Sequence, residues 1–253
     1  MLVMTFNLRF ATPSDGPNEW QYRQELVVEV IRRHRPDLLG TQEGTVPMLR
    51  FLEAQLPEYL PLTAHRQVDE TCQYPTIFYR GGRFAVQESR EFWLSQTPER
   101  HRSLSWGSAF PRLTTFGLFQ EEGRAEPFYF INTHLDHVSP EARLQGARMI
   151  RDYFKPLGRP MILAGDFNEP PEQAVYRELI LAGGPFIDTW RAFHAPGEEA
   201  TSQHYFDGKP RGARIDWILV TPDFRVRRVA IVTDNRDNRY PSDHFPYEAE
   251  VDY

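Results

Sequence analysis

The sequence lacks the features that would place it in several classes of protein. It has a single cysteine, Cys72, which excludes an internal disulfide and is compatible with a reducing compartment. Its longest apolar runs have the length of a strand and are interrupted by glycine, proline or charge, so no membrane span is expected. The N-terminus has no basic segment followed by an apolar stretch, so the chain is predicted to be cytoplasmic.

The chain also lacks an excess of positive charge. Its formal net charge is -6, and lysine occurs only at Lys155 and Lys209, the other basic residues being arginine. A protein that follows a long stretch of phosphate backbone usually carries a basic face. The composition therefore favours a small-molecule partner over nucleic acid.

What the sequence does contain is typical of a globular protein with a large core. Hydrophobic residues make up 40% and charged residues 25% of the 253 positions, which argues against disorder. No repeat, linker or low-complexity tract divides the chain. We therefore expect residues 1–253 to form one domain, and we expect a monomer.

Apolar periodicity predicts strands that alternate with helices. Strands are expected at residues 2–10, 37–43, 76–79, 84–94, 113–120, 127–135, 161–164, 213–220, 224–232 and 245–251. Helices are expected at residues 20–35, 48–56, 139–154 and 172–181. Residues 95–112 have no clear period and are expected to form a long loop, either functional or mobile.

The stretch from Met161 to Asn168 combines a strand with polar groups at its end. Four apolar residues lead into Gly165, Asp166, Phe167 and Asn168. Because side chains alternate along a strand, Asp166 and Asn168 are expected to point the same way and Phe167 to the opposite face. The same residues also suit an ordinary turn, so this stretch depends on its partners elsewhere.

Further polar residues occur where other predicted strands end. They are Asn7, Glu43, His134, Asp216 and the run Ser242-Asp243-His244. Each alone has an ordinary structural explanation, but Asp216 lies between Ile215 and Trp217, where an unpaired carboxylate would cost several kcal/mol. His244 is its natural partner. Strands that fix polar groups at one edge of a sheet are the usual scaffold of an active site.

The order of these motifs resembles the endonuclease/exonuclease/phosphatase superfamily, which has the DNase I-like fold. The matching residues are Asn7, Gln42-Glu43, Asn132-Thr133-His134, Gly165-Asp166-Phe167-Asn168, Arg214-Ile215-Asp216 and Ser242-Asp243-His244. Two tracts, one from Trp20 to Glu43 and one from Thr133 to His137, are most similar to small bacterial members described as metal-dependent hydrolases. The resemblance implies an α/β fold, a four-layer αββα sandwich of two mixed sheets with helices outside.

The resemblance also implies Mg²⁺- or Mn²⁺-dependent hydrolysis of a phosphate ester, with a diester favoured over a monoester. Asn7, Glu43 and Asp243 would hold the metal through hard oxygen atoms. Asp166 would orient or deprotonate the attacking water, and Asn168 would donate to the phosphoryl group. His244, paired with Asp216, and His134 would stabilise the phosphate.

Two departures separate this chain from abasic-site endonucleases, which carry an acid at the position of Arg9 and usually a tyrosine at that of His134. They disfavour DNA repair and favour one metal ion over two. Four weaker candidates for substrate contact are Arg80, Trp106, Arg112 and His137, each with a competing structural explanation. The alternatives are a nuclease acting on DNA or RNA, a phosphomonoesterase, and a catalytically inactive binding module on the same fold.

Overall fold

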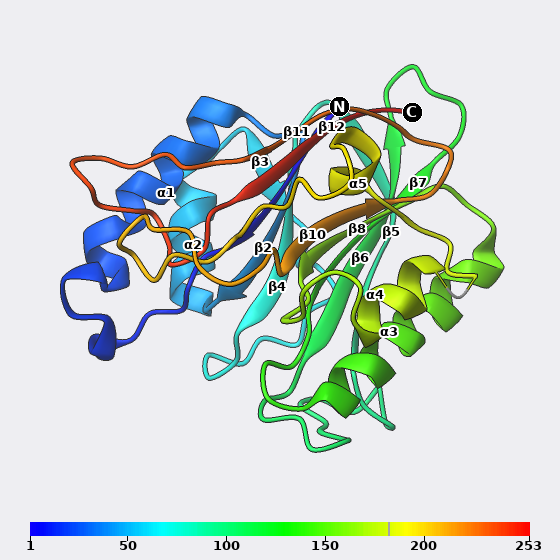
Figure 1. The fold of residues 1–253 in the computed structure, drawn as a ribbon, viewed down its shortest axis with the longest axis horizontal. Helices are drawn as coiled ribbons and strands as arrows, with labels where there is room; N and C mark the ends of the chain where they lie inside the picture. Colours follow the sequence, from blue (N-terminus) through cyan, green and yellow to red (C-terminus); the bar gives the residue numbers. More distant parts are fainter. Residues whose placement is uncertain (182) are drawn as a thin grey trace.

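The computed structural model describes residues 1–181 and 183–253, which are arranged in four layers (Figure 1). In this part of the chain the strands form two six-stranded sheets that pack face to face. Helices α1 (Trp20–His34) and α2 (Val46–Gln55) cover one sheet, and α3 (Pro140–Phe154) and α4 (Ala174–Tyr176) cover the other. The αββα sandwich predicted from the sequence is confirmed.

Both sheets are mixed. The first has the order β11-β12-β1-β2-β4-β3, and the second has the order β5-β6-β7-β8-β10-β9. The strands of the first sheet are β1 (Leu2–Asn7), β2 (Leu38–Gly44), β3 (Tyr59–Pro61), β4 (Tyr74–Arg80), β11 (Arg225–Ile231) and β12 (Tyr247–Asp252). Those of the second are β5 (Phe84–Trp93), β6 (Leu113–Glu121), β7 (Phe128–His134), β8 (Met161–Asp166), β9 (Ile187–Asp188) and β10 (Asp216–Val220).

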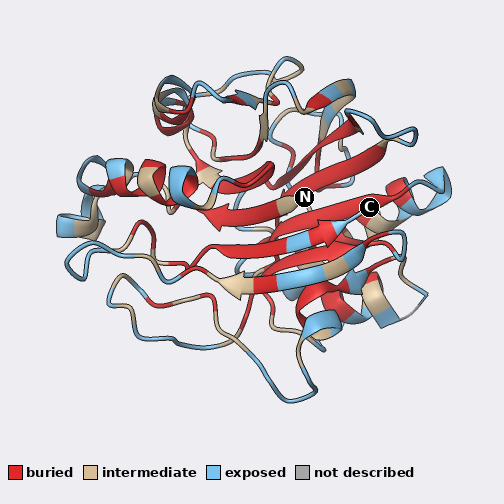
Figure 2. Ribbon diagram, turned by 90° about the horizontal axis from the view of Figure 1, so that it is seen from above, coloured by how far each residue is buried: buried red, intermediate tan, exposed pale blue. Residues whose placement is uncertain are grey.

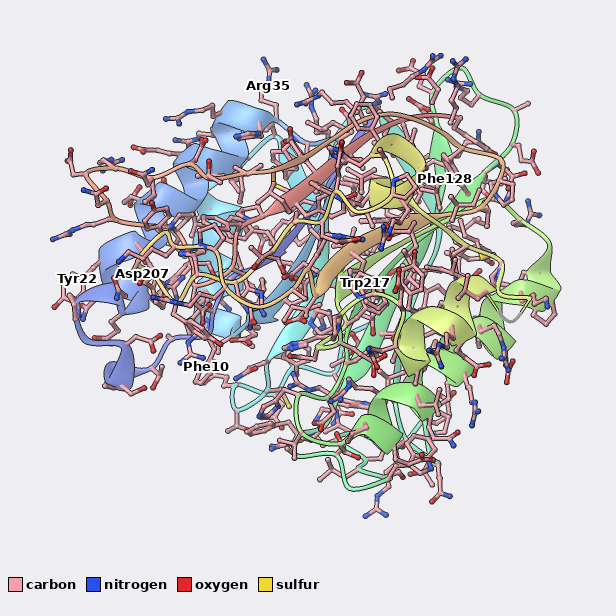
Figure 3. All side chains as sticks on the ribbon, in the orientation of Figure 1. Phe10, Tyr22, Arg35, Phe128, Asp207 and Trp217 are labelled. Atoms are coloured by element: carbon pink, nitrogen blue, oxygen red, sulfur yellow. The ribbon has the colours of Figure 1, made fainter. Side chains whose placement is uncertain are left out.

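Side-chain alternation along the strands separates three layers of core. In β1, Met4 and Phe6 pack under α1 and α2, whereas Val3 faces the second sheet. Phe128 lies in the core between the sheets and Trp217 in the core under α3 (Figure 3). The inner strands are therefore almost wholly buried, while the edge strands β5 and β11 and the outer faces of the helices carry exposed residues (Figure 2).

The predicted helices are present with small changes at their ends. Ser139 caps α3 by accepting a hydrogen bond from the Ala142 amide, as its sequence position indicates. The helix expected at residues 172–181 starts slightly later, as α4, and continues into a π-helical turn, η3 (Arg177–Leu181). Residues 95–112 form the long loop that was predicted.

Several short elements were not predicted, because they are too short to show a period. They are β3, β9, α5 (Thr189–Phe193) and the 3₁₀ turns η1 (Pro13–Asn18) and η2 (Lys155–Leu157). Of the described residues, none belongs to a helix with the length and apolar character needed to cross a bilayer.

Strand direction brings the polar strand ends to one edge of the sandwich. β1 and β2 are parallel, so Asn7 and Glu43 end at the same edge of the first sheet. In the second sheet His134 pairs with Asp166 across parallel strands, and Asp216 lies opposite Asp166 across antiparallel strands. The N- and C-termini lie together at the other end of the sheets (Figure 1).

Candidate active site

The strand-end residues surround a cavity of about 380 Å³. Both sheets and the loops beyond them contribute to its lining. The lining residues are Arg9, Phe10, Glu43, Gln73, Phe110, Arg112, His134, His137, Asp166, Asn168, Gln203, Tyr205, Asp243 and His244. Asn7 and Asp216 are buried directly behind this lining and contact Asp166 and His244, respectively.

Carboxylates converge around Asn7. Its Nδ2 atom donates to Asp166 Oδ2 at 2.9 Å and lies 3.3 Å from Glu43 Oε1. The second oxygen of Glu43 accepts from the Phe10 amide at 2.9 Å. The nearby cation Arg9 pairs with Asp15 at 2.9 Å and lies 4.0 Å from Asp243. Arg9 therefore does not neutralise Asp166 and Glu43.

This donor set fits a hard divalent cation. Asn7, Glu43 and Asp243 offer only amide and carboxylate oxygens, the ligands that Mg²⁺ and Mn²⁺ prefer. The Asn7 oxygen accepts a bond from the Arg9 amide, and a half-turn of the side-chain amide would turn that oxygen toward the carboxylates. The residues present are thus compatible with the family's metal chemistry.

A second cluster, Asp166, Asp216 and His244, places three ligand atoms within 4.8 Å of one another. Its chemistry fits a charged histidine better than a metal, because His244 Nδ1 already bonds Asp216 Oδ2 at 2.8 Å. Burial alone would lower the pKa of His244, but the charges of Asp216, Asp166 and Asp243 raise it well above its usual value. His244 is therefore an imidazolium facing the cavity.

Asp166 lies at the centre of the site. Burial and the charge of Asp216 raise the pKa of the Asp166 carboxyl above its usual value. Its Oδ1 accepts from the Asn168 amide at 2.8 Å, so Asp166 and Asn168 do lie side by side. Phe167 points away and stacks on Trp217 at 4.4 Å between ring centroids, as side-chain alternation predicts.

Arg112 fixes the tautomer of His134. Its Nη1 lies 2.9 Å from His134 Nδ1, and its Nη2 lies 3.2 Å from His137 Nδ1. A guanidinium has only donors, so His134 Nδ1 accepts. Burial and the charge of Arg112 hold the pKa of His134 well below its usual value, so the ring is neutral. Its proton is then on Nε2, which lies 3.5 Å from Asp166 Oδ2 and 3.0 Å from Asn168 Nδ2. Because two donors cannot bond each other, the Asn168 amide must present its oxygen to this proton.

The backbone of the site is strained at several points. Arg9, Glu43 and Asn168 have φ values of 51°, 62° and 50°, in the left-handed region that side chains other than Asn and Asp seldom adopt. Such strain is common where a fold over-determines a functional geometry. Gly165 is required for another reason, because a Cβ atom there would lie 2.1 Å from the Thr133 carbonyl oxygen.

Two of the family motif residues bridge the sheets and do not line the cavity. Gln42 Nε2 donates to Asn132 Oδ1 at 2.8 Å, and Asn132 Nδ2 donates to the carbonyl oxygens of Thr41 and Thr76. Gly40 allows this approach, since a Cβ atom there would lie 2.9 Å from Asn132 Oδ1. These residues hold the two sheets in register behind the site.

Arg23 joins the segments that carry the metal-ligand candidates. The buried guanidinium donates to the carbonyl oxygens of Leu8, Arg9, Asn18 and Pro241. Ser242 adds a second tie, because its hydroxyl donates to the Asn7 carbonyl oxygen at 2.6 Å. Residues at opposite ends of the chain are thereby fixed side by side.

The weaker sequence candidates divide into two groups. Arg112 and His137 line the cavity. Arg80 lies at the far end of the first sheet, 3.5 Å from Asp37, because β4 runs antiparallel to β2. Trp106 is also outside the cavity lining, and its carbonyl oxygen accepts from the Ser139 hydroxyl.

Other lining residues were not anticipated from the sequence. They are Phe10, Gln73, Phe110, Gln203 and Tyr205. All of them lie outside the named strands, so no period marked them. Aromatic residues close to an arginine, Phe110 near Arg112 and Phe10 beside Arg9, were the sole hint in the sequence.

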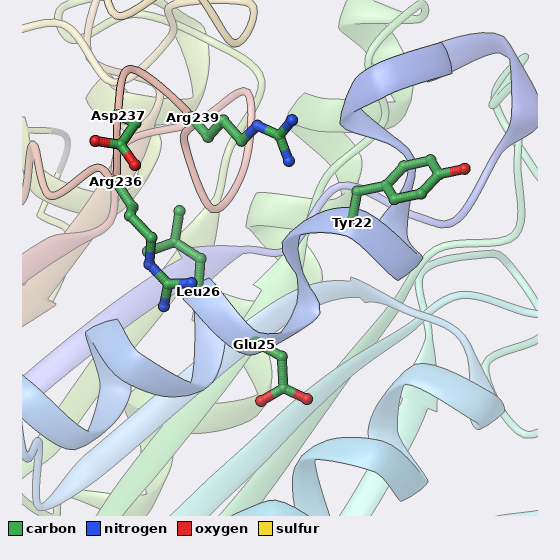
Figure 4. A pocket seen from close by; sticks show the side chains of 6 residues that line it. All are labelled: Tyr22, Glu25, Leu26, Arg236, Asp237 and Arg239. Atoms are coloured by element: carbon green, nitrogen blue, oxygen red, sulfur yellow. The ribbon is translucent and has the colours of Figure 1, made fainter.

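A larger cavity, of about 450 Å³, lies between α1 and residues 236–239 (Figure 4). It is lined by Tyr22, Glu25, Leu26, Arg236, Asp237 and Arg239. Arg236 is paired with Glu29, and no histidine or hydrogen-bonded acid pair is among these lining residues. The chemistry therefore favours the smaller cavity as the active site.

Comparisons with known proteins agree with this assignment of the fold. The family model described as "Endonuclease/Exonuclease/phosphatase family" matches residues 4–244. A functionally unknown conserved protein from Enterococcus faecalis is 34% identical, with a TM-score of 0.90, over 100% of this chain and 99% of that chain. A mannosyl-6-phosphatase from Bacteroides thetaiotaomicron is 30% identical, with a TM-score of 0.88, over 100% of both chains. A further family protein from Bacteroides thetaiotaomicron is 30% identical, with a TM-score of 0.89, over 99% and 97% of the two chains.

Proposed function

Because this chain belongs to the endonuclease/exonuclease/phosphatase family, we propose that it is a metal-dependent hydrolase of a small-molecule phosphate ester. One observation carries the proposal. Asp166 is buried in a single cavity with an imidazolium, a neutral histidine of fixed tautomer and a set of hard oxygen ligands. A hydrolase that attacks phosphorus needs each of these groups.

The proposed roles follow from the contacts. Mg²⁺ or Mn²⁺ held by Asn7, Glu43 and Asp243 would, when bound, supply positive charge to the phosphoryl oxygens. Asp166 accepts a proton from the attacking water, which its raised pKa favours. The water oxygen bonds to phosphorus in line with the breaking bond to the leaving oxygen, which takes up a proton and departs as an alcohol.

The remaining side chains hold the phosphoryl group. His244, kept charged by Asp216, faces the phosphate as a cation. His134 Nε2 and the Asn168 amide, which lie 3.0 Å apart, complete the polar groups around the phosphoryl group. The proposal treats residues 1–253 as one catalytic domain, since both sheets contribute to the cavity.

A phosphomonoester is the substrate class that the site favours, although the sequence suggested a diester. A monoester is a dianion, and the positive charges of Arg112 and His244 at the cavity suit it better than they suit a diester monoanion. The similar mannosyl-6-phosphatase also supports this choice. A phosphodiesterase is the second candidate. The exposed rings of Phe110 and Tyr205 line the cavity and would contact the second ester substituent of a diester.

The test is the initial rate on p-nitrophenyl phosphate and on bis(p-nitrophenyl) phosphate with Mg²⁺, with Mn²⁺ and with chelator. We expect turnover that chelator abolishes and a higher rate on the monoester. Asp166→Asn should keep the circular dichroism spectrum and lose activity by about 10³-fold. Full activity of Asp166→Asn would contradict the proposal.

A catalytically inactive binding module is the competing class. It would bind a ligand without turnover and has no need of a metal site. Isothermal titration with Mn²⁺ separates the two, because loss of the site would abolish the binding heat. Wild-type protein that neither binds Mn²⁺ nor turns over either ester would favour the module.

A further inference from the structure

A smaller cavity, of about 90 Å³, adjoins the catalytic cavity. Gln73, Phe110 and Arg112 line both cavities, so these three residues form the boundary between the two. Thr71 and Arg102 line the far side of the smaller one. Since Arg112 also contacts His134 and His137, a phosphoryl group bound near these histidines would have its ester oxygen within reach of the second cavity.

Phe110 separates the two cavities and provides an apolar surface. One side of its ring stacks on His137, with 5.7 Å between centroids and an interplanar angle of 24°. The ring nevertheless stays 54% exposed. A large exposed aromatic at the edge of a polar cavity is typical of a ligand contact, because a bound molecule would remove that apolar surface from water.

The far side of the small cavity supplies hydrogen-bonding groups with little net charge. Arg102 Nη1 lies 3.0 Å from Asp69 Oδ2, so its charge is already compensated. The side-chain amide of Gln73 has no hydrogen-bond partner among the described residues, which leaves both its donor and its acceptor available. The Thr71 hydroxyl already donates to Asp69 Oδ1 and accepts from Arg102 Nη1, both at 2.6 Å. The compensated cation and the free amide of Gln73 suit neutral hydroxyl groups better than a second phosphate.

The loop that carries Phe110 is fixed to the catalytic residues. Asp136 accepts from the Ala109 amide at 2.9 Å and from the Ser108 hydroxyl at 3.0 Å. The same carboxylate accepts from the amides of Val138 and Ser139. Phe110 is thus held relative to the histidines before any ligand binds, which reduces the entropy lost on binding.

We propose that this second cavity is a subsite for the leaving group, and that it selects a sugar or polyol phosphate. The inference rests on the proposed function, since it assigns the alcohol of the ester that the site would cleave. The apolar C–H face of the sugar packs on Phe110, and its hydroxyls bond Gln73 and Arg102. An apolar platform combined with a few convergent polar groups is the usual composition of a specific small-molecule site.

The test compares two alkyl phosphates with similar leaving groups, glucose 6-phosphate and methyl phosphate. We expect the wild type to prefer glucose 6-phosphate in kcat/KM by at least about tenfold, which corresponds to about 1.4 kcal/mol. Phe110→Ala and Gln73→Ala should each lower this ratio by about fivefold or more. Phe193→Ala is the matched control, because this exposed phenylalanine lies outside both cavities.

A binding measurement distinguishes failure of the subsite from failure of the hydrolase. Glucose 6-phosphate is titrated into Asp166→Asn, with and without Phe110→Ala, in the presence of Mg²⁺. Turnover of both esters with a ratio that Phe110→Ala does not change would overturn the subsite and leave the hydrolase standing. Binding weakened about fivefold by Phe110→Ala, without wild-type turnover, would support the subsite and refute the hydrolase. Neither binding nor turnover would overturn both.

Discussion

Two histidine–carboxylate pairs in this protein have the same geometry and different surroundings. His244 Nδ1 lies 2.8 Å from Asp216, and His34 Nδ1 lies 2.8 Å from Glu248. The first pair is buried beside Asp166 at the active-site cavity. The second is half-buried at the end of α1, outside the cavities described above. Geometry within the pair does not decide its role, so the neighbouring charges must.

The arginines at the active site and at the opposite end of the first sheet also differ in the charges that surround them. At the far end of the first sheet, Arg80 and Arg83 both pair with Asp37, which also accepts from the Leu2 amide at 2.7 Å. At the active site Arg112 contacts imidazoles, 2.9 Å from His134, and its Nε lies 3.9 Å from Asp136, so this arginine forms no ion pair with Glu43 or Asp166. Charge is balanced where it supports the fold and left unbalanced where a cation and a phosphate would bind.

The strongest test of this comparison is to make the same substitution in both histidine–carboxylate pairs. His244→Gln removes the cation that faces the phosphate, so kcat/KM should fall by about 10³-fold or more. His34→Gln should change kcat/KM by less than about twofold. Rates on p-nitrophenyl phosphate with Mg²⁺ provide the measurement. Equal losses in the two variants would contradict a role for His244 at the phosphate, because His34 lies outside the cavity.

Arg23 tests whether the active-site end depends on a buried clamp. Arg23→Lys cannot serve four carbonyl oxygens with one ammonium, so the free energy of unfolding should fall by about 2 to 4 kcal/mol. Displacement of the segments around Asn7 and Asp243 should also weaken Mn²⁺ binding. Urea denaturation and titration calorimetry measure the two effects. Arg33→Lys is the control, because Arg33 is exposed and pairs only with Asp234 among the described residues. An unchanged Mn²⁺ affinity would limit Arg23 to stability.

Arg112 and Arg80 form a matched pair at the two ends. Arg112→Lys keeps the charge but cannot hold both His134 and His137, so kcat/KM should fall by about tenfold, or about 1.4 kcal/mol. Arg80→Lys should leave kcat/KM unchanged, since Arg80 contacts Asp37 away from the site. The pH profile of Arg112→Gln adds a second measurement. Burial is the larger cause of the low pKa of His134 and remains, but loss of the Arg112 charge should raise this pKa part of the way toward its usual value. A profile that does not move would contradict the role of Arg112 in fixing the tautomer.

The sequence predicts those parts of the site that depend on strand ends. Asp166, His134 and Asp216 follow from apolar runs, and strand pairing then brings them together. The contact between Arg112 and His134 was not predictable, because it depends on the register of β6 and β7, which sets Thr114 opposite Thr133. The position of Arg80 away from the cavity could not be predicted either, because the direction of a strand in the sheet cannot be read from its own residues. Loop residues such as Phe110 and Gln73 have no period at all.

The smallest expected effect concerns the pair away from the active site. The hydrogen bond that His34 donates to Glu248 raises the pKa of His34, against the opposing effect of burial, above the 6.5 expected in the unfolded chain. A raised pKa contributes stability that is fully present below pH 6.5 and is lost as the pH rises through the folded value. His34 is partly exposed, so the contribution should be less than about 1 kcal/mol.

Urea denaturation of the wild type and of His34→Gln, at several pH values from 5 to 9, should therefore give a difference in unfolding free energy that shrinks with rising pH. In a Glu248→Gln background the pH-dependent effect of the same substitution should be smaller, because only Asp234, 3.3 Å from His34 Nε2, then raises the pKa. A difference that grows with pH would mean that His34 is destabilised as an imidazolium, and the two pairs would then differ in sign as well as in role.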